Sequence, residues 1–141
     1  MQPAFLFSLA NGFALLGWIV LVAGVIFRRD RLITLWAGRV WPITLSAAYA
    51  ILILFFFFSA PGGFDTLTNV QLLFTAPWAA LAGWVHYLAF DLFIGAWIAQ
   101  QVLALGMTRW VLILILPLTF LFGPIGVLAF FIARLMLVRH A

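Results

Sequence analysis

Cysteine is absent from this 141-residue chain, and charged side chains make up only 7% of it. The lack of cysteine excludes disulfides, thiolate catalysis, iron–sulfur clusters and zinc sites built on thiolates. A soluble domain carries about 25% charged residues, so the composition also excludes an ordinary soluble protein. Lysine is missing as well. The net charge of +4 is the balance of seven arginines against three aspartates. On so hydrophobic a chain, a small positive charge indicates how the protein is oriented in the membrane. No nucleic-acid partner is expected.

Apolar residues account for 68% of the chain and gather in four long stretches. About 20 apolar residues are enough to span the hydrocarbon core of a bilayer. The sequence therefore predicts an all-α, polytopic integral membrane protein, a four-transmembrane-helix bundle that forms a single domain over residues 1–141. The helices are expected near residues 5–27, 40–59, 77–105 and 109–138. Pro117 and the pair Gly123 and Pro124 interrupt the last one, and proline removes a backbone donor, so this fourth helix is expected to be kinked or broken.

The arginines predict the orientation of the chain in the membrane. Four of them lie between the first two helices: Arg28, Arg29, Arg31 and Arg39. Arg109 lies between the third and fourth helices, so both connections are expected in the cytoplasm, and the connection with Asp65 is expected on the far side. Arg139 opposes this assignment unless the fourth segment breaks and returns at Gly123 and Pro124. The use of arginine without lysine suggests a GC-rich bacterial gene, hence a multi-pass protein of the bacterial inner membrane.

Two ionisable side chains, His86 and Asp91, lie within the third apolar stretch. A carboxylate near the centre of a membrane helix costs about 2.5–3.5 kcal/mol on insertion scales, and by default it marks a functional or packing-critical site. Asp91 is either a site residue or a buried polar clamp between helices. His86 and Asp91 are about 140° apart around a helix, so they cannot form a tight pair on one face. The candidate partners of Asp91 are Tyr87, on its own face, and Arg134 from the fourth helix.

Other polar and aromatic residues are expected near the same depth. Asn11 on the first helix and Arg134 on the fourth fall toward the outer half, where they can share a site with the two ionisable residues. The alternatives are an interhelical hydrogen bond for Asn11 and an interfacial anchor for Arg134. Trp84 and Trp97 are expected deeper in the membrane than the tryptophans at its two surfaces, such as Trp78 and Trp110. They are expected to pack between helices or against a flat apolar ligand. No metal site is expected, since one needs three or four ligands, and whether a cofactor is bound is left open.

The run GWVHYLAFDLFIG, residues 83–95, resembles the signature of the abscisic-acid-deficient-4-type, or neoxanthin-synthase-like, family of membrane proteins. The segment FGPIG, residues 122–126, and Asn11 ahead of an apolar helix are also similar to that family. The resemblance covers nearly the whole chain and includes the four-helix layout. It implies carotenoid or xanthophyll chemistry, or carotenoid binding, in a pigmented membrane.

In plant members the implied reaction is the isomerisation of an epoxy-carotenoid to an allene, which needs an acid to open the epoxide and a base to remove a proton. On that analogy His86 and Asp91 are the candidate catalytic pair of an isomerase. The plant substrate itself is not carried over, so the expected ligand is a carotenoid, another polyene or a similar membrane lipid. The residues expected to contact it are Asn11, Trp84, Tyr87, Trp97 and Arg134.

The rival interpretation is a non-enzymatic accessory subunit that packs against a larger photosynthetic or respiratory membrane complex. Assembly into a homo-oligomer is a further alternative, and the composition does not decide it. Abundant phenylalanine and deep tryptophan fit either function, because both packing and ligand binding use aromatic surface. An enzyme is expected to lose activity and keep its fold in Asp91→Asn, whereas a structural subunit is expected to lose assembly.

Overall fold

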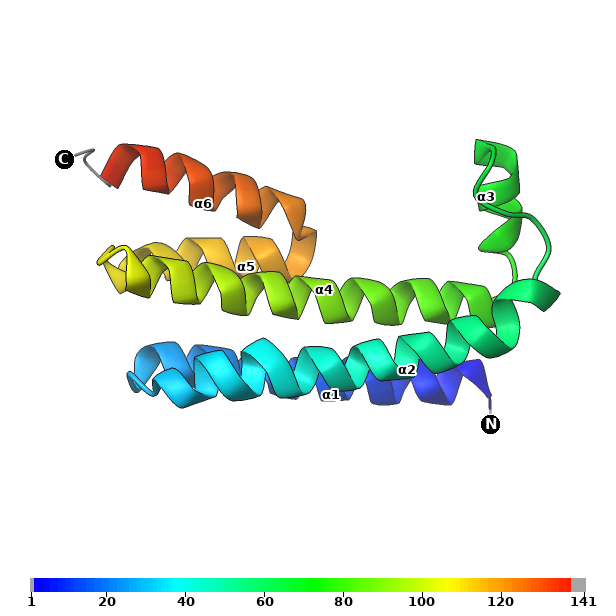
Figure 1. The fold of residues 1–141 in the computed structure, drawn as a ribbon, viewed down its shortest axis with the longest axis horizontal. Helices are drawn as coiled ribbons and strands as arrows, with labels where there is room; N and C mark the ends of the chain where they lie inside the picture. Colours follow the sequence, from blue (N-terminus) through cyan, green and yellow to red (C-terminus); the bar gives the residue numbers. More distant parts are fainter. Residues whose placement is uncertain (1, 138–141) are drawn as a thin grey trace.

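The computed structural model describes residues 2–137, which form helices joined by short turns (Figure 1). Three helices are long and apolar enough to cross a membrane: α1 (Pro3–Ile26), the second helix (Leu32–Ser59) and α4 (Pro77–Ala104). The second helix consists of a π-helix η1 (Leu32–Val40), α2 (Trp41–Phe56) and a 3-10 turn η2 (Phe57–Ser59). The shorter elements are α3 (Leu67–Leu73), the 3-10 turn η3 (Arg109–Val111), α5 (Leu112–Phe122) and α6 (Pro124–Leu137). The all-α fold class predicted from the sequence is confirmed.

Proline marks where several of these helices begin. Pro3, Pro77 and Pro124 each stand in a first helical turn, where the missing N–H has no intrahelical partner to lose. The second helix starts at Leu32 rather than near residue 40, because its first nine residues continue without a break into α2 as a π-helix. That π-helical segment ends at Val40, and Pro42 stands two residues later in the first turn of α2.

The fourth apolar stretch is two helices and not one. α5 ends at Phe122, the φ of the next residue, Gly123, is +35° in the left-handed region, and Pro124 begins α6. The chain then turns back, so that α6 lies beside α5 and ends near η3 (Figure 1). Helices of 11 and 14 residues rise about 16–21 Å, which is less than the roughly 30 Å of the hydrocarbon core. The expected break in the fourth helix at Gly123 and Pro124 is confirmed. The described residues form three helices long enough to cross a membrane, followed by a hairpin of two shorter ones, so the expected count of four membrane-spanning helices is not confirmed.

The return of α6 collects basic side chains at one end of the bundle. Arg109 begins η3 and Arg134 lies in the last turn of α6, at the end where α1 connects to η1 (Figure 1). The other described arginines belong to that connection or to η1: Arg28, Arg29, Arg31 and Arg39. Asp65 lies beside α3 at the opposite end. This asymmetry is the pattern that the positive-inside rule describes; Arg139 lies outside the described residues.

α4 is the central helix of the bundle. It packs against α1, η1 and α2 on one side and against α5 and α6 on the other (Figure 1). Close approach to α1 depends on glycine, since a Cβ on Gly95 would meet the Trp18 indole, and one on Gly17 would meet Leu92. Small residues at such crossings let membrane helices pack closely. Two faces of α4 are therefore covered by different helices, and this separates the polar residues that α4 carries.

Candidate functional site

His86 lies on the face of α4 that packs against α2. Its imidazole packs edge-on against the ring of Tyr49, with ring centres 5.2 Å apart, and stacks on Phe90 at 4.6 Å. A cavity of about 230 Å³, here called the outer pocket, opens beside these rings. Its walls are lined by Tyr49, Ile53, Phe57, Phe64, Leu73, Phe74, Ala79, Gly83 and His86. An imidazole and a phenol are thus the polar groups of a mostly aromatic cavity.

The short helix α3 helps to close the outer pocket and is held by its own polar contacts. Thr66 is its N-cap, and the Thr66 hydroxyl accepts a hydrogen bond from the backbone N–H of Asn69 at 3.1 Å. The Asn69 amide donates to the Asp65 carboxylate at 2.9 and 3.1 Å, and this bond lowers the pKa of Asp65 from its usual range. These contacts fix the segment that carries Leu73 and Phe74 into the pocket wall.

Asp91 faces the opposite side of α4, toward the turn between α5 and α6. Its side chain is 6% exposed, and its carboxylate lies so close to Gly123 that a Cβ there would overlap Oδ1. Gly123 immediately precedes α6, so the carboxylate stands at a helix N-terminus, where the helix dipole favours negative charge. No donor within residues 2–137 hydrogen-bonds Oδ2 of Asp91. The carboxylate therefore packs against the hairpin turn without a hydrogen bond to Oδ2 from any described residue.

Tyr87 reaches the same hairpin from one turn earlier on α4. Its hydroxyl donates to the backbone carbonyl of Leu121 at 3.0 Å and lies 3.4 Å from that of Phe120. Both carbonyls belong to the last turn of α5, where no intrahelical N–H is available. Within a bilayer such groups must be satisfied by the protein itself. Tyr87 thus binds the end of α5, while Asp91 faces the start of α6.

The remaining predicted residues lie in other places. The indole N–H of Trp84 donates to Oδ1 of Asn11 at 2.9 Å, which is the interhelical hydrogen bond expected as the alternative for Asn11. Trp97 packs edge-on against Phe130 of α6, with ring centres 5.5 Å apart. Arg134, the alternative partner considered for Asp91, lies roughly 16 Å along α6 from the hairpin turn, because α6 returns toward the arginine-rich end.

Asp91 and Gly123 come from the two segments that carry the family resemblance, and the fold brings these segments into contact. The model of the ABA4-like family, described as ABA DEFICIENT 4-like, matches residues 5–130. The chain belongs to this family. No curated protein and no solved structure matches it.

The fold of this ABA4-like chain separates His86 from Asp91, as their spacing along a helix requires. The residues predicted to form one site fall instead into an outer-pocket group (His86), a hairpin group (Tyr87 and Asp91) and an α1–α4 contact (Asn11 and Trp84). Their assigned catalytic and binding roles stay predictions.

Tyr49 is the candidate site residue that sequence reasoning missed. It shares one face of the second helix with Ile53 and Phe57, at intervals of four residues, and that pattern was readable from the sequence. Which face of α2 turns toward His86 was not readable, because rotation about a uniformly apolar helix leaves no periodic signal. The contact between the two rings appears only in the folded ABA4-like chain.

A larger cavity, of about 450 Å³, lies between α1, α2 and α4. It is lined by Leu6, Leu9, Ala10, Phe13, Thr44, Leu45, Ala48, Ile51, Leu52, Leu81 and Val85. The Thr44 hydroxyl already donates to the carbonyl of Val40 at 2.8 Å. This cavity can hold apolar chain but offers no group for proton transfer, so the outer pocket is the better candidate for chemistry.

Proposed function

We propose that this membrane protein acts in carotenoid or xanthophyll metabolism by binding a polyene, with one end group of the polyene in the outer pocket. The proposal is carried by the pairing of His86 with Tyr49 in a cavity that is otherwise apolar and largely aromatic. Flat conjugated groups pack well against aromatic rings. His86 and Phe74 at the pocket are exposed on the surface of the bundle, so an apolar chain can enter sideways from the bilayer.

The proposed chemistry is isomerisation of that end group by proton transfer. One group delivers a proton to the ligand and another removes one, so the product contains the same atoms and no oxidant or reductant is consumed. Imidazole is the commonest general acid or base in enzymes, and a phenol can serve beside it. His86 and Tyr49 take these roles in the proposal. Asp91 takes a positioning role at the hairpin instead of the catalytic role expected from the sequence.

The pigment profile of a carotenoid-producing host tests the proposal. Cells express the wild type, His86→Gln, Tyr49→Phe or the control Phe55→Leu, which changes an exposed α2 side chain outside the outer pocket. Extracts are compared by chromatography and mass spectrometry. We expect a carotenoid of unchanged mass but altered retention in the wild type and the control, and its loss in His86→Gln.

Two results contradict parts of this proposal. A pigment that co-purifies with the wild type but is not altered by it removes the isomerase step and leaves binding. Identical profiles with wild type, variants and empty vector, when all chains are equally well folded and carry no pigment, overturn the proposal. That second result favours the accessory subunit of a larger membrane complex.

A further inference from the structure

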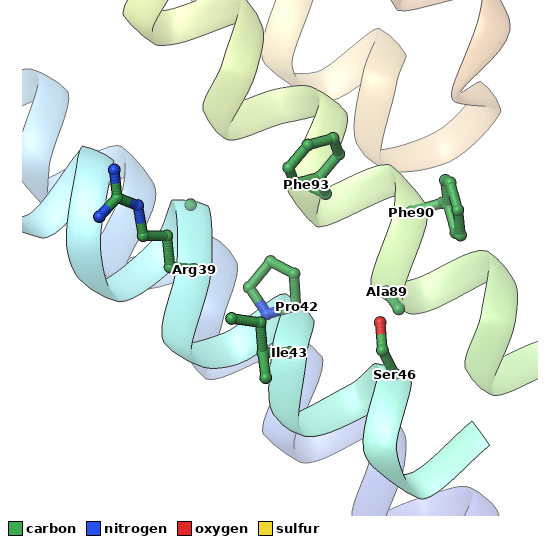
Figure 2. Close-up of a pocket in the computed structure, with 8 residues that line it drawn as sticks. Arg39, Pro42, Ile43, Ser46, Ala89, Phe90 and Phe93 are labelled. Carbon is green, nitrogen blue, oxygen red and sulfur yellow. The ribbon is translucent and has the colours of Figure 1, made fainter. Parts of the chain in front are cut away.

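A third cavity, separate from the outer pocket, follows the inner half of the contact between α2 and α4. It measures about 310 Å³ and is here called the inner groove. Pro42 and Ser46 of α2 form one wall, and Ala89, Phe90 and Phe93 of α4 form the other (Figure 2). Arg39 stands at its end nearest the arginine-rich side of the bundle. The inner groove is therefore apolar along its length and cationic at one end.

Arg39 presents its charge away from the apolar walls. The guanidinium points along the helix, away from Pro42 and Phe93 (Figure 2), and the side chain is exposed. Long basic side chains in membranes place the stem on apolar surface and the charged group at the interface. Among residues 2–137, Arg39 forms no side-chain hydrogen bond, in contrast to Arg109, which donates to the carbonyl of Val25 at 3.0 Å. The fork of donors on Arg39 is thus available to an anion.

The segment that carries Arg39 is itself unusual. Arg39 is the last residue but one of η1, a nine-residue π-helix. π-helical turns are rare and occur frequently at functional sites. η1 packs against α4 with little clearance, since a Cβ on Gly38 would meet the side-chain amide of Gln100 on α4. The position of Arg39 beside the groove is therefore fixed by close packing.

We propose that the inner groove binds an anionic glycerophospholipid, with its phosphate on Arg39 and an acyl chain along Pro42, Phe90 and Phe93. Guanidinium groups suit phosphate because two parallel N–H donors match two of its oxygens. Basic pockets between membrane helices on the cytoplasmic side bind anionic headgroups. Arg28, Arg29 and Arg31 lie at the same end of the bundle and add to the attraction. A free phosphate would leave the apolar walls uncovered, which is why a lipid is the occupant.

This site goes beyond the proposed function and does not depend on it. The lipid site is defined by charge and apolar area at the inner end, whereas the outer pocket is defined by His86 and Tyr49. Its readout is the number of bound lipids and not a pigment, so either proposal can fail while the other stands.

Native mass spectrometry of the purified full chain tests the lipid site. The protein is released from detergent in the presence of equal amounts of dioleoylphosphatidylglycerol and dioleoylphosphatidylcholine. We expect the wild type to retain phosphatidylglycerol in preference, and Arg39→Gln to lower that binding about fivefold, the effect of one arginine near an anionic lipid surface. Arg134→Gln removes the same charge at the same end, outside the groove, and is expected to change little. Inorganic phosphate is expected not to displace the lipid.

A second pair of variants tests the apolar part of the groove without changing charge. Ser46→Phe places a ring in the groove from an exposed position, and Ala47→Phe places the same ring on the next residue, outside it. We expect phosphatidylglycerol binding to fall in Ser46→Phe only, with circular dichroism showing that both variants keep their helices. The proposal is overturned if Arg39→Gln and Arg134→Gln lose binding equally, if the wild type does not distinguish the two lipids, or if inorganic phosphate displaces the lipid.

Discussion

The carboxylate of Asp91 lies against the α-carbon of Gly123, where the chain reverses between α5 and α6. Gly123 is in the left-handed region, with φ of +35°, and the turn lies about half-way along α4 (Figure 1). Non-helical backbone at membrane depth is stable only where protein covers it or where it lines a water-filled cavity. Asp91 and Tyr87 cover this turn from α4, so we assign both residues to holding the hairpin in place.

Gly123→Ala is expected to destabilise the bundle. The added Cβ overlaps a carboxylate oxygen of Asp91 and the backbone is left-handed, and overpacking of this kind costs about 1–3 kcal/mol. Thermal unfolding in detergent, followed by circular dichroism, is expected to show a lower midpoint. Gly12→Ala is the matched control, because a Cβ at Gly12 meets nothing within 4 Å.

A double variant checks that the Asp91 contact is the cause. Removing the carboxylate in Asp91→Ala gives the new methyl group room, so part of the loss in Gly123→Ala is expected to disappear in the combined variant. Residues in contact show such non-additivity, whereas independent sites do not. Strict additivity of the two single effects is the result that contradicts the assignment.

Two tyrosine-to-phenylalanine substitutions are expected to separate stability from pigment conversion. Tyr87→Phe removes the donor to the carbonyls at the end of α5, which leaves these acceptors without a partner in the bilayer and costs about 1–3 kcal/mol. Tyr49→Phe removes no hydrogen bond within the described residues and is expected to leave stability unchanged while it lowers pigment conversion. Unfolding midpoints and pigment profiles of the two variants, measured side by side, check this. Equal stability of both variants argues against the hairpin role of Tyr87.

The hydrogen bond between Trp84 and Asn11 is expected to couple α4 to α1. Interhelical hydrogen bonds in membrane proteins contribute about 0.6 kcal/mol on average and about 1.7 kcal/mol at most. A double-mutant cycle with Asn11→Ala and Trp84→Phe, measured by unfolding in mixed micelles, is expected to give a coupling energy in that range. A coupling of zero indicates that Asn11 and Trp84 contribute independently, as ligand contacts would.

Acid is expected to loosen α3. Hydrogen bonding from Asn69 lowers the pKa of Asp65 in the folded state, so the unfolded segment binds a proton more readily than the folded one. The contribution is therefore complete above the ordinary carboxyl pKa and is lost as pH falls through the lowered value. Amide-exchange protection factors of Asn69 and Val70, measured from neutral to acidic pH, are expected to drop over that window. In Asp65→Asn the protection is expected to be independent of pH.

The positions of the long helices could be predicted from the sequence because the bilayer restricts which backbone structures are stable. Every backbone group must be paired inside the bilayer, so long apolar runs become helices, and proline and glycine mark their ends. The start of the second helix at Leu32 and the short helix α3 were not predicted. The first was obscured by basic residues near the membrane surface and the second by its small size, since a helix of seven residues depends on its cap and its packing.

Composition alone settled that the chain is a helical membrane protein, and the motif around His86 and Asp91 led to the family. The five-residue spacing also determined that these two side chains point to different sides of α4, because a helix turns about 100° per residue. Only the tertiary structure decided which partner each one meets: Tyr49 for His86 and the hairpin turn for Asp91. Lipid and protein neighbours are equally apolar, so the rotation of each helix is set by close packing, which no periodic pattern in the sequence records.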